Sequence, residues 1–125
     1  MWKFAITVSL ALCSCAGIAP PAAKGSVDHI VLIWLKRPDN IEDHLAIRRA
    51  SDELREIPGI RFLDTGTPLA SDRAVVDDSF DIGVTMRFDS AEALRAYEAH
   101  PLHVRNATTV LKPLSRKIVI YDIKR

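Results

Sequence analysis

Cysteine is scarce in this chain of 125 residues, and neither sign of charge predominates. The two cysteines, Cys13 and Cys15, both lie near the N-terminus, so the rest of the chain has neither a disulfide framework nor a thiolate metal site. Lysine and arginine number 17 and aspartate and glutamate 16, which gives a net charge of +1. A nearly neutral chain has no field that attracts nucleic acid, so we expect no nucleic-acid partner.

Motifs for cofactors and metals are also lacking. The sequence has no glycine-rich phosphate loop and no nucleophile elbow. An acidic stretch over residues 72–81 is interrupted by Arg73 and lacks the glycine and glutamate of a calcium loop. His100 and His103 make a poor metal site because Pro101 breaks the helix between them. We therefore expect no cofactor and no metal.

The N-terminal segment has the pattern of a secretory signal. One lysine precedes an apolar run that ends at Leu12 and is shorter than the roughly 20 apolar residues a membrane helix needs. The string Leu-Cys-Ser-Cys ending at Cys15 resembles the lipobox of bacterial lipoproteins, which makes Cys15 the predicted lipidation site and residues 1–14 the signal peptide. Cys13 is the weaker candidate for lipidation, because Leu12 would then stand just before the cleavage site, where the signal peptidase needs a small residue such as Ser14. The alternative is an ordinary cleaved signal that releases a soluble protein.

Residues 15–26 contain prolines, a glycine and small side chains, and we interpret them as a tether. The mature protein is then expected to be exported and lipid-anchored at the cell envelope, with the membrane as a partner through the anchor. Ala16 follows the lipidated cysteine, where an inner-membrane retention signal would have aspartate. In a diderm source we therefore expect the outer membrane, facing the periplasm.

Residues 27–125 alternate between strand and helix patterns and form the predicted folded domain. A strand over residues 27–36 is apolar on both faces. Its faces carry Ile30, Leu32 and Trp34 on one side and Val27, Val31, Ile33 and Leu35 on the other. Asp39 and Glu42 form a capping-box pattern that begins a helix, which Pro58-Gly59 ends.

Two more strands are predicted over residues 60–69 and 80–88, the latter with strict apolar alternation. A second cap pattern begins a helix that breaks near His100. A shorter helix then reaches Pro113, and residues 116–124 form a last strand that is apolar on both faces. The order β-α-β-β-α-β predicts an α+β, ferredoxin-like fold with helices on one face of a single antiparallel sheet.

That architecture leaves one apolar face of the sheet uncovered. An isolated domain would expose this face as a large patch, so we expect something to cover it. A second copy using the same face is the simplest cover, which predicts a homodimer, a dimeric α/β barrel. The alternative is a monomer whose tether folds over the sheet.

Three segments resemble the stress-responsive A/B barrel (Dabb) family. They are DHIVL at residues 28–32, MRFDS with EAL at residues 86–94 and, above all, YEAHPLH at residues 97–103. The resemblance runs from about Val27 to Ile123 and implies a dimeric ferredoxin-like protein. Members include plant stress-associated proteins, bacterial proteins of unassigned role and a plant polyketide cyclase.

The resemblance also implies a site. In the cyclase-like members, the tyrosine and second histidine of the last string are the catalytic pair, and Tyr97 and His103 hold these positions here. A first-strand histidine matching His29 belongs to the same pocket. The cyclase has a further histidine in the third strand, where this chain has Ile82, and this departure weakens the transfer of its particular reaction.

His29, Tyr97 and His103 are thus expected to line one pocket between sheet and helices. An imidazole can shuttle protons near neutral pH, and a phenol beside it can hold a carbonyl or enolate. Structural roles are the alternative: a buried tyrosine often only bonds a backbone group, and the two histidines can hydrogen-bond locally. His100, before a proline, is expected to be a cap or turn residue.

Two functions remain open from the sequence. In the first, each subunit binds a small apolar or aromatic ligand without turnover. In the second, the domain is a cofactor-free enzyme of the polyketide cyclase or isomerase type, with His103 as the base and Tyr97 as the orienting acid.

Overall fold

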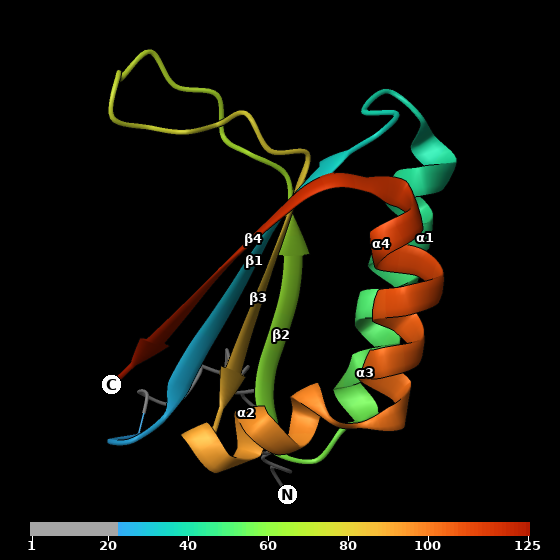
Figure 1. Ribbon diagram of the computed structural model, residues 1–125. Coiled ribbons are helices and arrows are strands. Elements are labelled where there is room, and N and C mark those ends of the chain that lie inside the picture. Colours follow the sequence, from blue (N-terminus) through green and yellow to red (C-terminus); the bar gives the residue numbers. More distant parts are fainter. Residues whose placement is uncertain (1–22) are drawn as a thin grey trace, which may run out of the picture.

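The computed structural model describes residues 23–125, so the predicted signal peptide, both cysteines and most of the tether lie outside the described residues. A single sheet has all its helices on one side (Figure 1). The elements are β1 (Val27–Leu35), α1 (Ile41–Glu53), the 3-10 turn η1 (Leu54–Glu56), β2 (Ile60–Gly66), β3 (Ile82–Phe88), α2 (Ala91–Glu98), α3 (Pro101–Asn106), the π-helical turn η2 (Ala107–Leu111), α4 (Lys112–Leu114) and β4 (Ser115–Lys124). None of the helices in this part of the chain is long and apolar enough to cross a membrane.

The four strands follow the order β2-β3-β1-β4, and every neighbouring pair is antiparallel. The central strand β1 pairs Val27 with Phe88 of β3 on one side and with Lys124 of β4 on the other. This arrangement confirms the predicted ferredoxin-like fold. The third strand predicted from the sequence begins two residues too early and the second ends three residues too late, because residues 67–81 leave the sheet as a loop.

Side-chain caps fix where the two main helices begin. The Asn40 side chain accepts a hydrogen bond from the backbone N–H of Asp43, so Asn40 and not Asp39 caps α1. Both residue types cap well, and sequence alone does not choose between neighbours. Ser90 caps α2 in the same way. Between them, Gly59 has φ +92, and a Cβ there would lie 2.9 Å from the Cβ of Ala93, so this turn requires glycine.

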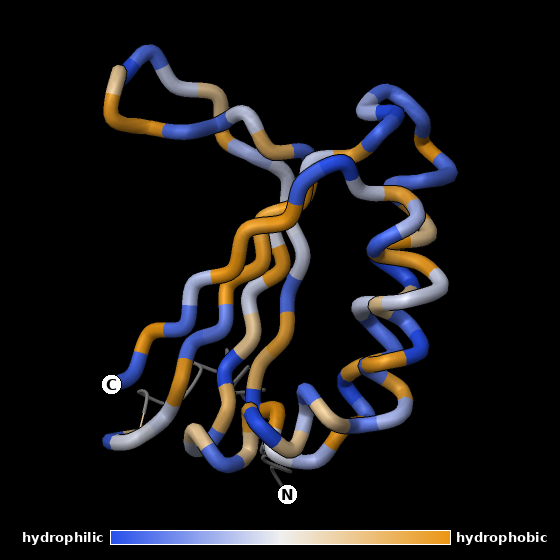
Figure 2. Tube along the Cα trace, viewed as in Figure 1, coloured by the Kyte–Doolittle hydropathy of each residue, from blue (hydrophilic) through white to orange (hydrophobic). Residues whose placement is uncertain are grey.

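The core lies between the helices and the sheet face that carries Val27, Val31, Ile33 and Leu35, as predicted. Hydrophobic positions run along the strands that form this face (Figure 2). Ile82 also lies on this face and is fully buried. It holds the third-strand position at which the cyclase of the resembling family has a histidine.

The opposite face differs from the prediction at one end. Trp34, expected to need a partner subunit, is only 3% exposed because its own chain covers it. Phe80 packs edge-on against its ring, the Ser79 hydroxyl accepts a hydrogen bond from its indole N–H at 3.0 Å, and Lys117 lies over it. We call the whole of this sheet face, Trp34 included, the uncovered face. Away from Trp34 it still carries apolar side chains in contact with solvent: Ile30, Leu32, Phe62, Val119, Tyr121 and Ile123.

The last helical run continues one residue past Pro113 and includes a π-helical turn, which the sequence did not indicate. The hydroxyls of Thr108 and Thr109 donate to the carbonyls of Val104 and Arg105, at 2.7 and 2.8 Å. Such bonds compete with the backbone ladder and favour irregular helix. The wide turn places Ala107, Val110 and Leu111 toward the sheet, where they help to line a cavity.

Candidate functional site

A cavity of about 70 Å³ lies between the sheet and the helices. Most of its wall is apolar, from β1, β3, β4, α1, η1 and η2: Val31, Ile33, Ile47, Ala50, Leu54, Val84, Met86, Ala107, Val110, Leu111 and Ile120. His29, Tyr97 and His103 complete the wall with Ser51 and Asn106. The structure therefore brings together the three residues that the sequence singled out, from β1, α2 and α3. Ile120, half exposed on the edge strand β4, marks where the cavity reaches the surface.

His29 is buried on β1 and is held by a carboxylate that sequence reasoning missed. Its Nδ1 lies 2.6 Å from Oδ1 of Asp122, the residue directly opposite on β4. A carboxylate accepts, so Nδ1 carries the proton and Nε2 of the neutral ring is an acceptor. The only available signal was the aspartate in the last strand, and finding the pair requires the strand register, which the sequence leaves open.

Tyr97 lies at the centre of the aromatic side chains. Its ring centroid is 4.4 Å from that of His103, 4.9 Å from that of Phe88 and 5.9 Å from that of His29. Among residues 23–125 the Tyr97 hydroxyl has no hydrogen-bond partner. Of the side-chain nitrogen and oxygen atoms there that the protein fully encloses, only Ser26 Oγ lacks a partner, so the Tyr97 hydroxyl is not one of the enclosed atoms. The hydroxyl is therefore accessible, although Tyr97 as a whole is only 2% exposed.

Burial raises the pKa of the Tyr97 phenol well above its ordinary value of 10.0, and the nearby Glu98 carboxylate raises it further. At neutral pH this phenol stays protonated. It can donate a hydrogen bond to a bound oxygen, and it is a weak acid.

His103 is oriented by the backbone. Its Nδ1 lies 3.0 Å from the carbonyl oxygen of Glu98. Because a carbonyl only accepts, Nδ1 carries the proton and the Nε2 lone pair is free of partners within the described residues. His100 has another role, since its Nδ1 accepts from the backbone N–H of Leu102 and caps α3. The expectation that His100 is a cap residue is confirmed.

Asn106 and Ser51 line the cavity without having been predicted. The Asn106 amide donates to the Ala50 carbonyl at 2.9 Å and to the Glu53 carboxylate at 3.2 Å, which fastens α3 to α1. The Ser51 hydroxyl donates to the Ile47 carbonyl one turn back. Nothing in the local sequence distinguishes these two from surface residues. Their burial comes from the packing of α1 against the run that follows α3.

The cavity combines one neutral hydroxyl donor with two imidazole acceptors in an apolar wall. Such a site can orient a small molecule by one polar group and exclude water from the rest of it. An imidazole and a phenol this close can also move a proton to or from a carbon acid. No group of three or more histidine, cysteine, aspartate or glutamate side chains within residues 23–125 is placed to hold a metal ion.

A βαββαβ domain with a cavity between its sheet and its helices defines a class of ferredoxin-like α+β proteins. The chain belongs to the stress responsive A/B barrel domain family, whose model matches residues 27–125. None of the curated proteins matches the chain significantly in sequence.

Solved structures share this fold. A Dabb family protein from Mesorhizobium loti is 23% identical, with a TM-score of 0.67, and the match covers 82% of this chain and 98% of that one. A dimeric protein of unknown function from Bacteroides fragilis is 24% identical, with a TM-score of 0.64 over 82% and 98% of the two chains. Hydroxynitrile lyase from Passiflora edulis is 23% identical, with a TM-score of 0.70 over 82% and 95%. Each match covers nearly the whole of the other chain, and the family model covers residues 27–125, so this part of the chain corresponds to one whole domain of the family.

Proposed function

We propose that this protein is a lipid-anchored homodimer that binds a small, largely apolar ligand in the cavity of each subunit. The carrying observation is that His29, Tyr97 and His103 meet in one apolar cavity, each with a polar atom left free of protein partners in the described part of the chain. None of these three atoms is fully enclosed by the protein, so a molecule in the cavity can reach each of them and satisfy its hydrogen bonding.

The cavity limits the size and chemistry of the ligand. An engineered cavity of about 150 Å³ holds benzene, so 70 Å³ admits a short chain or part of a ring before side chains must move. Tyr97 offers a donor, and in the neutral rings the two histidine Nε2 atoms are acceptors. A ligand with one carbonyl or hydroxyl group and an apolar remainder fits this arrangement, and the surface near Ile120 is the place for it to enter.

The homodimer rests on the uncovered face. Leu32 of β1 adjoins Val119, Tyr121 and Ile123 of β4 in one apolar surface, and Tyr121 and Ile123 are each about half exposed. Phe62 of β2 is also about half exposed, beyond Thr85 and Arg87 of β3. Similar structures from Bacteroides fragilis and Thermobifida fusca are described as dimeric. The lipid anchor rests on the lipobox-like string at Cys15 alone.

The binding proposal is tested with residues 23–125 and the chain's two tyrosines. Extracts of the native host are passed over the protein, and retained compounds are identified by mass spectrometry. Tyr97→Phe should lose most of the retained compound, whereas Tyr121→Phe, on the uncovered face, should retain the wild-type amount. Equal retention by both variants and by His103→Ala contradicts binding in this cavity.

One observation favours a second candidate, a cofactor-free enzyme of the cyclase or isomerase type. The Tyr97 and His103 rings are 4.4 Å apart, with a neutral donor and a free imidazole lone pair, as a general base and an orienting acid require. The fold is shared with a hydroxynitrile lyase. Incubating retained carbonyl compounds in D₂O with the protein tests this candidate: an enzyme exchanges protons next to the carbonyl, and His103→Gln abolishes the exchange while the compound still binds.

A further inference from the structure

The loop between β2 and β3, residues 67–81, is long for a compact domain, in which loops above about 12–15 residues are usually functional. We call it the arm. Asp78 accepts a hydrogen bond across the arm from the backbone N–H of Ser71 at 2.9 Å, and Asp77 accepts one from the backbone N–H of Ser79, two residues further on, at 3.0 Å. At its base, Asp81 accepts from the backbone N–H of Leu35 at 2.7 Å. These bonds fix the shape of the arm.

The arm encloses space that its own side chains do not fill. A hollow of about 440 Å³ lies between its two limbs, bordered by residues such as Pro68, Arg73, Asp78 and Phe80. Compact loops of this length are normally packed by their own side chains. Here two apolar side chains of the arm are in water instead: Leu69, which borders the hollow, is 88% exposed, and Val75, which does not, is 91% exposed. An ordered loop that leaves its interior open and its apolar residues in water has the features of a binding element.

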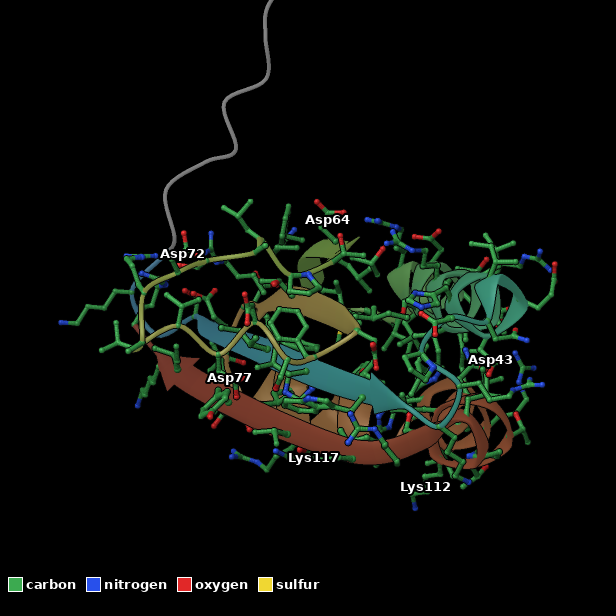
Figure 3. All side chains as sticks on the ribbon, turned by 90° about the horizontal axis from the view of Figure 1, so that it is seen from above. Asp43, Asp64, Asp72, Asp77, Lys112 and Lys117 are labelled. Atoms are coloured by element: carbon green, nitrogen blue, oxygen red, sulfur yellow. The ribbon has the colours of Figure 1, made fainter. Side chains whose placement is uncertain are left out.

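The arm stands on the side of the sheet away from the helices (Figure 1). Seen from above, Asp72 and Asp77 on the arm lie across the sheet from Asp43 on α1 (Figure 3). The base of the arm rests on the uncovered face itself, where Ser79 and Phe80 contact Trp34. The arm is therefore continuous with the apolar surface that the proposed homodimer uses.

We propose that the arm clasps a second copy of this chain, whose side chains fill the hollow and cover Leu69 and Val75. The proposal rests on the proposed homodimer and adds a contact element to it. Because Phe80 and Lys117 remove Trp34 from the surface, one end of the uncovered face is closed to a partner. The arm supplies apolar contacts at that same end.

A small ligand in the hollow fits less well than a second copy. Val75 does not border the hollow, so a ligand held there would leave it exposed, whereas a subunit packed on the adjoining face can cover both apolar side chains. A stable interface buries about 800 Å² per partner, more than a small ligand can cover.

The test compares three exposed apolar positions in residues 23–125. Leu69→Asp and Val75→Asp change the arm, and Ile41→Asp is the matched control, 65% exposed at the start of α1 on the helix side. Sedimentation equilibrium over a dilution series should show the dimer dissociation constant raised at least tenfold by either arm variant and unchanged by Ile41→Asp. Because these side chains are in water, their replacement leaves the subunit folded.

Photo-cross-linking provides a direct measurement of the contact. The photoreactive p-benzoyl-phenylalanine in place of Leu69 should yield a covalent dimer on irradiation, and in place of Ile41 it should not. A wild-type dimer whose dissociation constant is unaffected by both arm variants, with no cross-link from position 69, overturns the clasp and leaves the homodimer standing. A wild-type protein that stays monomeric at all concentrations overturns both.

Discussion

His29 Nδ1 and Asp122 Oδ1 are 2.6 Å apart across the β1–β4 pair. This bond joins a buried ring on the central strand to a half-exposed carboxylate on the edge strand. It holds the ring so that Nε2 is left for the cavity. The last strand therefore contributes to the candidate site twice, through Asp122 and through Ile120 in the wall.

The first prediction concerns the tautomer of His29. With Asp122 as acceptor, neutral His29 should carry its proton on Nδ1. Asp122→Ala removes the acceptor, and the ring should shift toward the Nε2–H form. Nitrogen-15 NMR of the imidazole distinguishes the two forms, and His44, far from this pair in the sequence and on α1, is the internal control. A wild-type His29 protonated on Nε2 contradicts the assigned geometry.

The second prediction concerns the stability of Tyr97→Phe. Because the hydroxyl has no partner among the described residues, removing it should change the free energy of unfolding by less than about 0.5 kcal/mol. If the hydroxyl were satisfied by the backbone, its loss would cost about 1 kcal/mol. Urea denaturation of wild type and variant at pH 7 separates these outcomes, and a loss of 1 kcal/mol or more would support the architectural role.

The third prediction concerns acid stability. Asp28 is buried on the sheet between Arg87, at 2.6 Å, and Arg125. The Arg87 guanidinium, followed by that of Arg125, lowers the pKa of this carboxyl below its ordinary 3.8 against the opposing effect of burial. A lowered pKa means that the charged form stabilises the fold above about pH 4, and that this contribution is lost as pH falls through the folded-state value.

Asp28→Asn should therefore reduce the free energy of unfolding at pH 7 by about 1–3 kcal/mol, since both guanidiniums lose a charged acceptor. The difference between wild type and variant should shrink as the pH is lowered below 4. Asp64→Asn, at an exposed aspartate on β2, is the control and should have little effect at either pH. A difference that is constant with pH would show that the Asp28 charge contributes nothing.

The fourth prediction separates two residues of the uncovered face. Leu32→Asp should dissociate the proposed dimer while the subunit stays folded, because Leu32 is partly in contact with solvent in the single subunit. Trp34→Asp should lower the melting temperature of the subunit itself, because Phe80 and Ser79 already bury Trp34. Light scattering and thermal melts of both variants check this, and a Leu32→Asp protein that remains dimeric contradicts the proposed interface.

The fifth prediction concerns the anchor. In the host, labelled fatty acid should be incorporated into the wild-type protein and into Cys13→Ala, and not into Cys15→Ala. Autoradiography of the immunoprecipitated proteins is the measurement. Labelling lost in Cys13→Ala and kept in Cys15→Ala would move the lipidation site, and no labelling at all would favour an ordinary cleaved signal.

The order of the elements could be predicted because it follows from local patterns. Strict alternation marks β3, and the caps lie within one residue of their predicted places. Proline and glycine follow the helical run as predicted, although α1 itself ends at Glu53 and the run continues to Glu56 as the 3-10 turn η1. Tyr97 and His103 could be placed near each other because only a turn separates them. His29 could be assigned to the same pocket because the family resemblance implies it. The spacing of residues in the sequence does not predict contacts between segments this far apart.

The parts that the sequence could not predict depend on contacts between distant segments. Asp122 pairs with His29 only in one strand register, and Asn106 is buried only because α3 packs on α1. Trp34 looked like an interface residue because nothing in residues 67–81 indicates that Phe80 folds back over it. The early end of β2 at Gly66 has a local cause instead, because Pro68 follows and lacks the backbone N–H that a strand would use.

The strand order also determines when the candidate site is complete. Val27 pairs with Lys124, so the central strand gains its second neighbour from the opposite end of the domain. Pairing of such distant segments is slow, because a long loop must close before any contact forms. During synthesis β1 keeps one open edge until β4 has emerged. Since Ile120 of that strand is part of the cavity wall and Asp122 orients His29, a growing chain has no complete cavity, and the sheet and the candidate site are completed in the same final step.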